Sequence, residues 1–289
     1  MGNVNPSEKL LHAVIWIDST VIGPHGPVPV RCYSPSIDSA PVSTKTIVWI
    51  HGGGFFKGNL DQSESHHVAL ALAAAGFRVI TVAYQLATVS KFHWSARGLQ
   101  RSSAIHYPIP VNEVVAVVQE AQREAPNGVI LGGASAGACL SAAAVLRLAD
   151  DGADALAGTF FAYGLFHARL PTLSRELRRR IRGLRRFVHT PTALNLMNLH
   201  YAGRRSALTE YDAFPGGHPL HGFPPTLMID ADHDSMRASG SQFAQELSAA
   251  GIAVDRQVLP GSFHAFLNRQ EDPNFATGLN LIIEWARRV

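Results

Sequence analysis

Cysteine is scarce in this chain of 289 residues, which contains only Cys32 and Cys139. The two lie far apart and match no CxxC or other metal-ligand spacing, so the sequence argues against a disulfide framework or a cysteine-based metal cluster. Two free thiols are typical of proteins in a reducing compartment. The N-terminus also lacks the charged and then apolar pattern of a secretory signal, and we therefore expect a cytoplasmic protein.

An excess of one charge is missing as well. Lys and Arg number 25 and Asp and Glu 22, a formal net charge of +3, which is too small to indicate nucleic acid or a membrane surface as a partner. No apolar run is long enough to cross a bilayer, so we expect no stable membrane insertion. Hydrophobic residues make up 46% of the chain, which excludes intrinsic disorder and is enough for a sizeable core.

Short apolar, β-rich runs alternate along the chain with longer helical patterns. This alternation predicts an α/β fold, in which helices cover both faces of a mostly parallel sheet. The first two runs are joined by a turn rich in Gly and Pro, and they predict an antiparallel hairpin at the sheet edge. The expected strands lie at 13–18, 28–33, 46–50, 78–83, 129–131, 159–162, 226–229 and 253–258, and the expected helices at 62–75, 111–124, 136–149, 235–250 and 274–287.

One long stretch interrupts this alternation. Residues 164–222 contain no expected strand and are predicted to form a helical cap, inserted between the core segments 1–163 and 223–289. Seven arginines lie between Arg175 and Arg186, and apolar residues recur there at helical steps, which predicts a basic amphipathic helix. We expect its arginines either to form a solvated outer face or to attract an acidic substrate or an anionic surface. The apolar stripe consists of Leu173, Leu177, Ile181, Leu184 and Val188.

The most specific motif is Gly-Ala-Ser-Ala-Gly at 133–137, which joins an expected strand to an expected helix. A serine between two such glycines sits on a sharp, strained turn that exposes its hydroxyl beside helix N-terminal amides, as a nucleophile requires. A capping serine at a Gly/Ala-rich helix start also fits the pentapeptide taken alone. On the first interpretation Ser135 is the nucleophile.

A glycine loop, His-Gly-Gly-Gly-Phe at 51–55, directly follows another expected strand. Consecutive glycines let backbone amides point at one oxygen, and such donors stabilise the negative charge that acyl transfer creates. We expect these donors to be the amides of Gly52, Gly53 and Ala136. The alternative is a phosphate-binding loop, but the segment lacks the Lys-Ser/Thr ending and the GxGxxG spacing.

Carboxylates and a histidine follow the last two expected strands. The segment Asp-Ala-Asp-His-Asp at 230–234 fails as a calcium loop, because it lacks the Gly and Glu that an EF-hand needs at positions 6 and 12. A carboxylate just past a strand end is instead well placed to orient a histidine, and Asp234 and Asp232 are the candidates. His264 lies in the loop after the last strand, from which its ring can reach the serine.

These motifs resemble the hormone-sensitive-lipase-like branch of the α/β-hydrolases, a group of carboxylesterases and lipases. The segments 51–54 and 133–137 are similar to that family's oxyanion-hole signature and nucleophile elbow. The resemblance runs from about residue 46 to the C-terminus, with all motifs in order. It implies the α/β-hydrolase fold with a helical cap.

The resemblance also selects the acid. Residues 231–240 are similar to the family's acid-bearing segment, and this similarity assigns the role to Asp234. The chain order Ser135, Asp234, His264 is then the order expected of α/β-hydrolases. One departure is Ala265, which stands where the family has glycine after the histidine.

The activity that follows is hydrolysis of a small-molecule carboxylic ester through an acyl-enzyme, without metal or cofactor. Phe55, the cap and the irregular stretch 88–106 are expected to supply the pocket walls. One alternative is an amidase with the same residues. Another is a non-catalytic binding protein, since the family resembles plant hormone receptors that lack the catalytic histidine, although His264 is present here. An exposed edge strand would let two copies pair as a homodimer.

Overall fold

The computed structural model describes residues 14–36, 45–88, 92–95, 98–101, 104–125, 127–181 and 189–289. Eight strands form its central sheet. In chain order they are β1 (Val14–Gly23), β2 (Gly26–Pro35), β3 (Thr46–Ile50), β4 (Arg78–Val82), β7 (Val129–Ala134), β8 (Gly158–Ala162), β9 (Thr226–Ala231) and β10 (Val254–Leu259).

The strands lie side by side in the order β1-β2-β4-β3-β7-β8-β9-β10. β1 and β2 form an antiparallel hairpin at the edge, and β2 also pairs antiparallel with β4. The remaining neighbours are all parallel. The predicted α/β class, the mostly parallel sheet and the edge hairpin are therefore confirmed.

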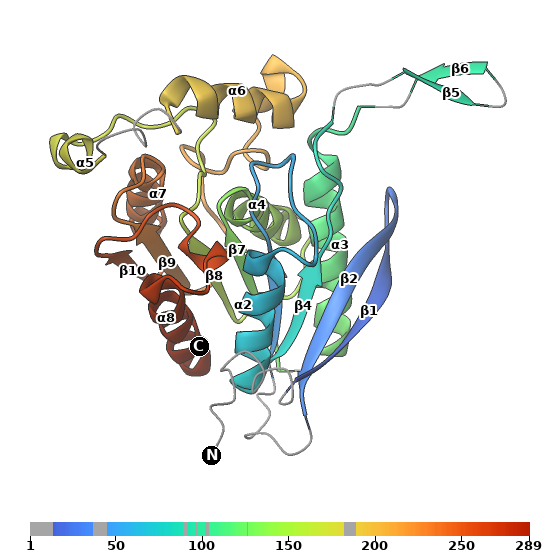
Figure 1. Ribbon diagram of the computed structural model, residues 1–289, viewed down its shortest axis with the longest axis horizontal. Helices are drawn as coiled ribbons and strands as arrows, with labels where there is room; N and C mark the ends of the chain where they lie inside the picture. The colour runs from blue at the N-terminus through green and yellow to red at the C-terminus, as the bar shows by residue number, and fades with distance from the viewer. Residues whose placement is uncertain are drawn as a thin grey trace.

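Helices cover both faces of this sheet (Figure 1). Those of the described residues are α2 (Ser63–Ala74), α3 (Ile109–Glu124), α4 (Ala136–Asp150), α5 (Arg175–Arg180), α6 (Pro191–Ala202), α7 (Arg237–Ala249) and α8 (Pro273–Arg288), with the short 3₁₀ helices η2 (Arg205–Thr209) and η3 (Phe266–Asn268). One face packs against α3, α4 and α7, and the other against α2 and α8.

The strand β3 illustrates why these sequences form a buried sheet. All five of its residues are buried, and successive side chains point to opposite faces of a strand. Val48 and Ile50 accordingly join the core on the α3, α4 and α7 side, while Ile47 and Trp49 join the core on the α2 and α8 side. A continuous apolar run is therefore what a strand covered on both faces requires.

The basic helix is shorter than predicted. The helix α5 ends at Arg180, because Ile181 already has an extended backbone. The carbonyl of Arg180 accepts a hydrogen bond from the His233 ring at 2.9 Å, so the end of α5 is bound to the segment that follows β9. A tertiary contact thus overrides the helical spacing. Leu184 and Val188, the last residues of the predicted stripe, lie outside the described residues.

The stretch 88–106, predicted to be irregular, contains a second small sheet. The strands β5 (Phe92–Ser95) and β6 (Gly98–Arg101) pair antiparallel, and Thr88 forms a bridge with Ile105 at the base of the hairpin. Figure 1 shows this hairpin directed away from the body of the molecule. The prediction was wrong because two strands of four residues carry too little periodicity to identify.

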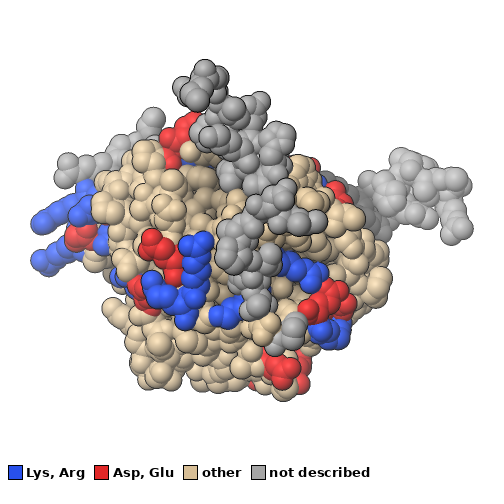
Figure 2. Space-filling view, turned by 90° about the horizontal axis from the view of Figure 1, so that it is seen from below, with Lys and Arg blue, Asp and Glu red and all other residues tan. Residues whose placement is uncertain are grey.

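Opposite charges lie next to one another on the end of the molecule opposite α6 (Figure 2). Ion pairs such as Arg78–Glu124 and Arg288–Asp255 join residues far apart in the chain, in line with the small net charge. Among the described residues, no helix is both long enough and apolar enough to cross a membrane.

Candidate active site

Ser135 occupies the turn between β7 and α4 with φ 52° and ψ −116°, the strained backbone that the elbow motif predicts. The flanking glycines are required by close backbone approach. A Cβ atom on Gly133 would lie 2.3 Å from the Gly137 carbonyl oxygen, and one on Gly137 would lie 2.2 Å from the Ile50 carbonyl oxygen. The motif therefore brings the end of β3, the turn and the start of α4 into contact.

The structure brings Ser135, His264 and Asp234 together in one hydrogen-bonded series. The Ser135 Oγ lies 3.0 Å from His264 Nε2, and His264 Nδ1 lies 2.6 Å from the Asp234 carboxylate. The alternative acid, Asp232, binds Arg180 and Arg237 instead. The geometry thus agrees with the choice of Asp234 over Asp232.

Asp234 and His264 each shift the pKa of the other toward its charged form. Burial by itself lowers the pKa of His264, but the charge of Asp234 and its hydrogen bond outweigh burial and raise the pKa above the ordinary 6.5. Burial likewise favours a high pKa for Asp234, yet the adjoining His264 holds the pKa of this carboxyl below 3.8. Asp234 is therefore ionised at neutral pH and accepts the Nδ1–H of His264, which leaves Nε2 facing the serine.

The backbone conformation of Ala265, directly after His264, shows why glycine is usual at this position in the family. Ala265 has φ 60° and ψ 37°, in the left-handed region that glycine adopts without steric cost. The chain turns there into η3, and this turn directs His264 back toward Ser135. The alanine keeps the conformation at a modest cost in backbone strain.

Within the described residues, the backbone amides near Ser135 that lack a hydrogen-bond partner differ from the donors predicted. The Gly52 N–H donates to Glu64 Oε1 at 2.6 Å, so it is not free for an oxyanion, and the prediction was wrong for this residue. The amides of Gly53, Gly54 and Ala136 donate no hydrogen bond within the described parts of the chain. Gly53 and Gly54 line the same cavity as Ser135.

His51, the first residue of that motif, holds the loop in shape. Its Nδ1–H donates to the Gly52 carbonyl at 2.7 Å, and its ring stacks on Tyr84 with centroids 4.6 Å apart. Burial lowers the pKa of His51 to about 4, so the ring is neutral near pH 7. This histidine is thus a structural part of the loop.

Phe55, predicted to contact the substrate, belongs to the core. Its side chain is fully buried and stacks on Tyr201 with ring centroids 4.0 Å apart. The next residue, Phe56, lines the cavity and is 44% exposed. The prediction was wrong because Phe55 has φ 70°, and the resulting turn points the two neighbouring rings in different directions.

This pair gives a matched test. We expect Phe55→Ala to lower the free energy of unfolding by about 3–5 kcal/mol, because it removes a buried ring. Phe56→Ala should change it by about 0.5 kcal/mol or less, but raise the KM for an ester about fivefold, equivalent to roughly 1 kcal/mol of lost apolar contact. Urea unfolding and steady-state kinetics on both variants check this, and a larger KM effect at Phe55 would contradict it.

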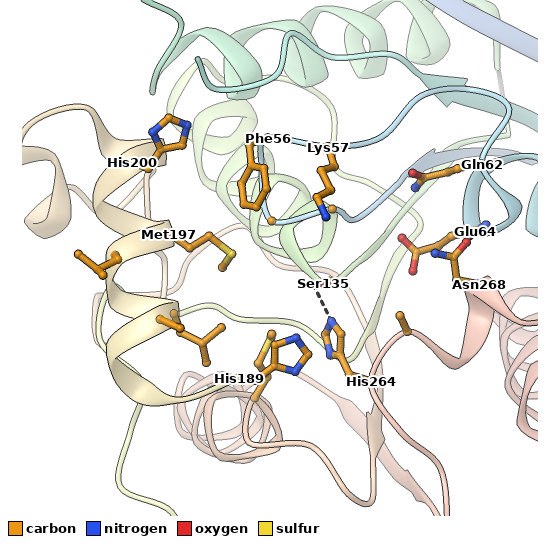
Figure 3. A pocket seen from close by; sticks show the side chains of 17 residues that line it. Phe56, Lys57, Gln62, Glu64, Ser135, His189, Met197, His200, His264 and Asn268 are labelled. Atoms are coloured by element: carbon orange, nitrogen blue, oxygen red, sulfur yellow. Dashed lines mark hydrogen bonds between the residues drawn. The ribbon is translucent and has the colours of Figure 1, made fainter. Parts of the chain in front are cut away.

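Ser135 and His264 open into a cavity of about 810 Å³. Figure 3 shows α6 on one side of them, with Met197 directed inward, and Gln62, Glu64 and Asn268 on the other side. The segment 164–222 contributes the cavity residues Ala193, Leu194, Leu196, Met197 and His200 from α6, together with His189.

The stretch 88–106 was also expected to supply a wall of this pocket. No described cavity residue belongs to that stretch, and its hairpin points away from the molecule (Figure 1). Its predicted role in the pocket is therefore wrong for the part of the chain that the structure describes.

The side chain of His189, which is of a type that can ligate a metal ion, lies beside His264. Its ring lies edge-on to that of His264, with centroids 4.7 Å apart. His189, Asp234 and His264 present ligand atoms within 4.8 Å of one another, the only such group found among the described residues. Asp234 and His264 already bind each other, so a metal ion at Nδ1 would have to break that hydrogen bond.

Several site residues were not identified in the sequence analysis, among them Gly54, Phe56, Glu64 and His189. Gly54 stood inside a recognised motif, but the motif does not reveal which amides are free. Phe56 was next to the residue chosen. Glu64 had only a weak signal, an acid in the first turn of a helix whose other buried residues are mostly apolar. His189 had none, since it belongs to no motif and reaches the site from the segment 164–222.

A family model described as "alpha/beta hydrolase fold" matches residues 99–268, more than half of the chain. The chain belongs to the α/β-hydrolase family. A second model, BD-FAE, matches residues 31–164 of this α/β-hydrolase. The two matches together cover the glycine loop, the elbow and all three residues of the hydrogen-bonded series.

Individual relatives of this α/β-hydrolase are esterases and lipases. It is 29% identical to the carboxylic ester hydrolase LipN of Mycobacterium tuberculosis, over 93% of this chain and 69% of that protein. The structure of a bacterial heroin esterase superposes with a TM-score of 0.76 at 26% identity, over 98% of this chain and 87% of the other.

The named resemblance is also found among solved structures. Brefeldin A esterase, a bacterial homologue of human hormone-sensitive lipase, superposes with a TM-score of 0.78 at 22% identity, over 99% of this chain and 79% of the other, a likeness of fold. The predicted relationship to hormone-sensitive-lipase-like proteins is confirmed, and this α/β-hydrolase is a carboxylesterase-type hydrolase.

Proposed function

We propose that the protein hydrolyses carboxylic esters through an acyl-enzyme on Ser135. The observation that carries the proposal is the arrangement around one cavity: a serine hydroxyl 3.0 Å from a histidine nitrogen, that histidine 2.6 Å from a buried carboxylate, and adjacent backbone amides without a partner in the described chain. Nucleophile, general base, orienting acid and oxyanion donors are the four parts that serine acyl transfer needs.

The reaction proceeds in two balanced halves. Ser135 Oγ attacks the ester carbonyl carbon while His264 Nε2 takes the hydroxyl proton, and the resulting oxyanion accepts hydrogen bonds from the amides of Gly53, Gly54 and Ala136. The C–O bond to the alcohol then breaks, and His264 returns the proton to the departing oxygen. Water attacks the acyl-enzyme with its proton passing to His264, and the acid leaves as that proton returns to Ser135.

The two sides of the cavity suit the two parts of an ester of small to medium size. Leu194, Leu196 and Met197 offer an apolar wall for the acyl chain, and Lys57, Gln62 and Asn268 offer polar groups for the alcohol part. The wall on α6 runs from Ala193 to His200, about 11 Å along the helix axis at 1.5 Å per residue. An extended sixteen-carbon chain is longer than this wall.

Hydrolysis of p-nitrophenyl esters with two- to sixteen-carbon acyl chains tests the proposal. We expect kcat/KM to peak at short or medium chains, because longer chains gain no further apolar contact on α6. A matched p-nitroanilide distinguishes an amidase, for which anilides would turn over as fast as esters. If no ester reacts and an organophosphonate probe fails to label Ser135, the proposal is wrong and ligand binding without catalysis takes its place.

A further inference from the structure

Glu64 is a buried carboxylate to which the proposed reaction gives no role. It lies in the first turn of α2 and is 2% exposed. Its Oε1 accepts the Gly52 N–H at 2.6 Å, and its Oε2 accepts the Tyr163 hydroxyl at 2.6 Å. Burial raises the pKa of Glu64, which reflects the cost of removing a carboxylate from water. An apolar side chain would fill the same space without this desolvation cost.

The contact with Gly52 places Glu64 against the glycine loop. Gly52 is packed between Glu64 and the nucleophile, since a Cβ atom on it would lie 2.7 Å from Glu64 Oε1 and 3.0 Å from the Ser135 Cβ. The next two residues, Gly53 and Gly54, carry the amides without a partner in the described chain. The hydrogen bond from the Gly52 N–H to Glu64 therefore fixes the position of Gly52, which directly precedes the Gly53 and Gly54 amides in the chain.

The other contacts of Glu64 tie it to the histidine side of the site. The ring of Tyr163 lies edge-on to the His264 ring with centroids 5.0 Å apart. The Glu64 N–H donates to the Asn268 side chain at 3.1 Å, and the Glu64 carbonyl accepts the Trp49 indole N–H at 2.8 Å. Both the carboxylate and the backbone of Glu64 are thus held in place, and Figure 3 shows it beside Asn268, across the cavity from α6.

We propose that Glu64 is a positioning residue, which holds the glycine loop in its oxyanion-binding conformation through the hydrogen bond to Gly52, while Tyr163 orients its carboxylate. The proposal rests on the proposed function, because it concerns donors to an oxyanion. The oxyanion exists only in the transition state and the tetrahedral intermediate, so loss of this support acts on kcat and leaves KM nearly unchanged.

Two substitutions separate the hydrogen bond from the charge. Glu64→Ala removes the acceptor, and we expect kcat for a p-nitrophenyl ester to fall about 100-fold, as for the loss of one oxyanion donor. Glu64→Gln keeps an amide oxygen for Gly52 and an amide NH₂ that donates to the Tyr163 oxygen, so kcat should stay within about tenfold of the wild type. Equal losses in both variants would overturn positioning by the hydrogen bond.

Glu113 provides a matched control. It is also buried, 1% exposed, and accepts the backbone N–H of Gln85 at 2.6 Å, but Glu113 does not line the cavity in the described chain. Glu113→Ala should leave kcat close to wild type. If Glu113→Ala lowers kcat as much as Glu64→Ala, the effect is general destabilisation and the proposal is wrong.

Amide hydrogen exchange tests the loop without relying on activity. We expect the peptide covering 51–58 to exchange faster in Glu64→Ala than in the wild type, and at the wild-type rate in Glu113→Ala. Unchanged exchange at 51–58 in Glu64→Ala would overturn the proposal even if the wild type is an active esterase. Faster exchange with no ester turnover by the wild type would support the loop contact while the proposed function fails.

Discussion

Ser135→Ala is expected to lower kcat for p-nitrophenyl esters about a millionfold, because it removes the only atom that forms the acyl-enzyme. The amides of Gly53, Gly54 and Ala136 remain, so a small rate above that of water should persist. The fold should be retained, since Ala keeps the Cβ atom at φ 52° and loses only the hydroxyl. Steady-state kinetics with freshly purified protein measure the loss, and circular dichroism checks the fold.

Ser141 is the matched control for this substitution. It lies on α4, the helix that Ser135 directly precedes, is fully buried, and donates its hydroxyl to the Gly132 carbonyl at 3.2 Å. Ser141→Ala should cost about 1 kcal/mol of stability, the contribution of one hydrogen bond, and leave kcat unchanged. Retention of more than a few per cent of activity in Ser135→Ala would contradict the proposed nucleophile.

Asp234→Asn is expected to lower kcat about 10⁴-fold. The asparagine is neutral, so it neither stabilises the imidazolium that forms during the reaction nor holds His264 with Nε2 free to accept a proton. Asp232→Asn is the matched comparison. Asp232 lies only two residues before Asp234 in the chain, but its carboxylate binds Arg180 and Arg237. If Asp232→Asn causes the larger loss, the acid has been misassigned.

The same variant should change the pH dependence of kcat/KM. His264 acts as a base only when neutral, so wild-type activity falls as the pH drops through its pKa, which lies above 6.5. Asp234 raises that pKa by its charge and its hydrogen bond. Removal of the charge lowers the pKa, and the acid limb of Asp234→Asn should therefore move to lower pH. A limb that moves to higher pH would contradict this account.

The parts of the site that were predicted from sequence depend on short-range steric requirements. The Gly-x-Ser-x-Gly turn needs glycine at 133 and 137 because backbone carbonyls lie where a Cβ atom would be. The position of His264 follows from the parallel order of β9 and β10, since loops at the carboxyl ends of parallel strands meet at one edge of the sheet. The structure brings these residues together as the motifs predict.

The sequence predictions were wrong where the position of a residue depends on a contact with another part of the chain. Whether the Gly52 amide is free depends on Glu64, and whether Phe55 or Phe56 faces the cavity depends on Tyr201 and α6. The helical stripe after Arg175 is cut short by a contact with His233. Neither motif nor periodicity contains these contacts, because each is formed only when the strands and the segment 164–222 have packed together.

Apolar periodicity and glycine positions reflect local backbone geometry, and they were enough to predict the fold class, the nucleophile and the histidine. The resemblance of the motifs to those of a known family supplied the family and the choice of Asp234 as the acid. Only tertiary contacts decide which amides have no partner within the described residues, which aromatic ring lines the cavity and how Glu64 contacts both the glycine loop and Tyr163. Glu64 and Tyr163 are 99 positions apart. A hydrogen bond requires atoms within about 3 Å, and only the folded sheet, with α2 packed on it, brings this pair so close.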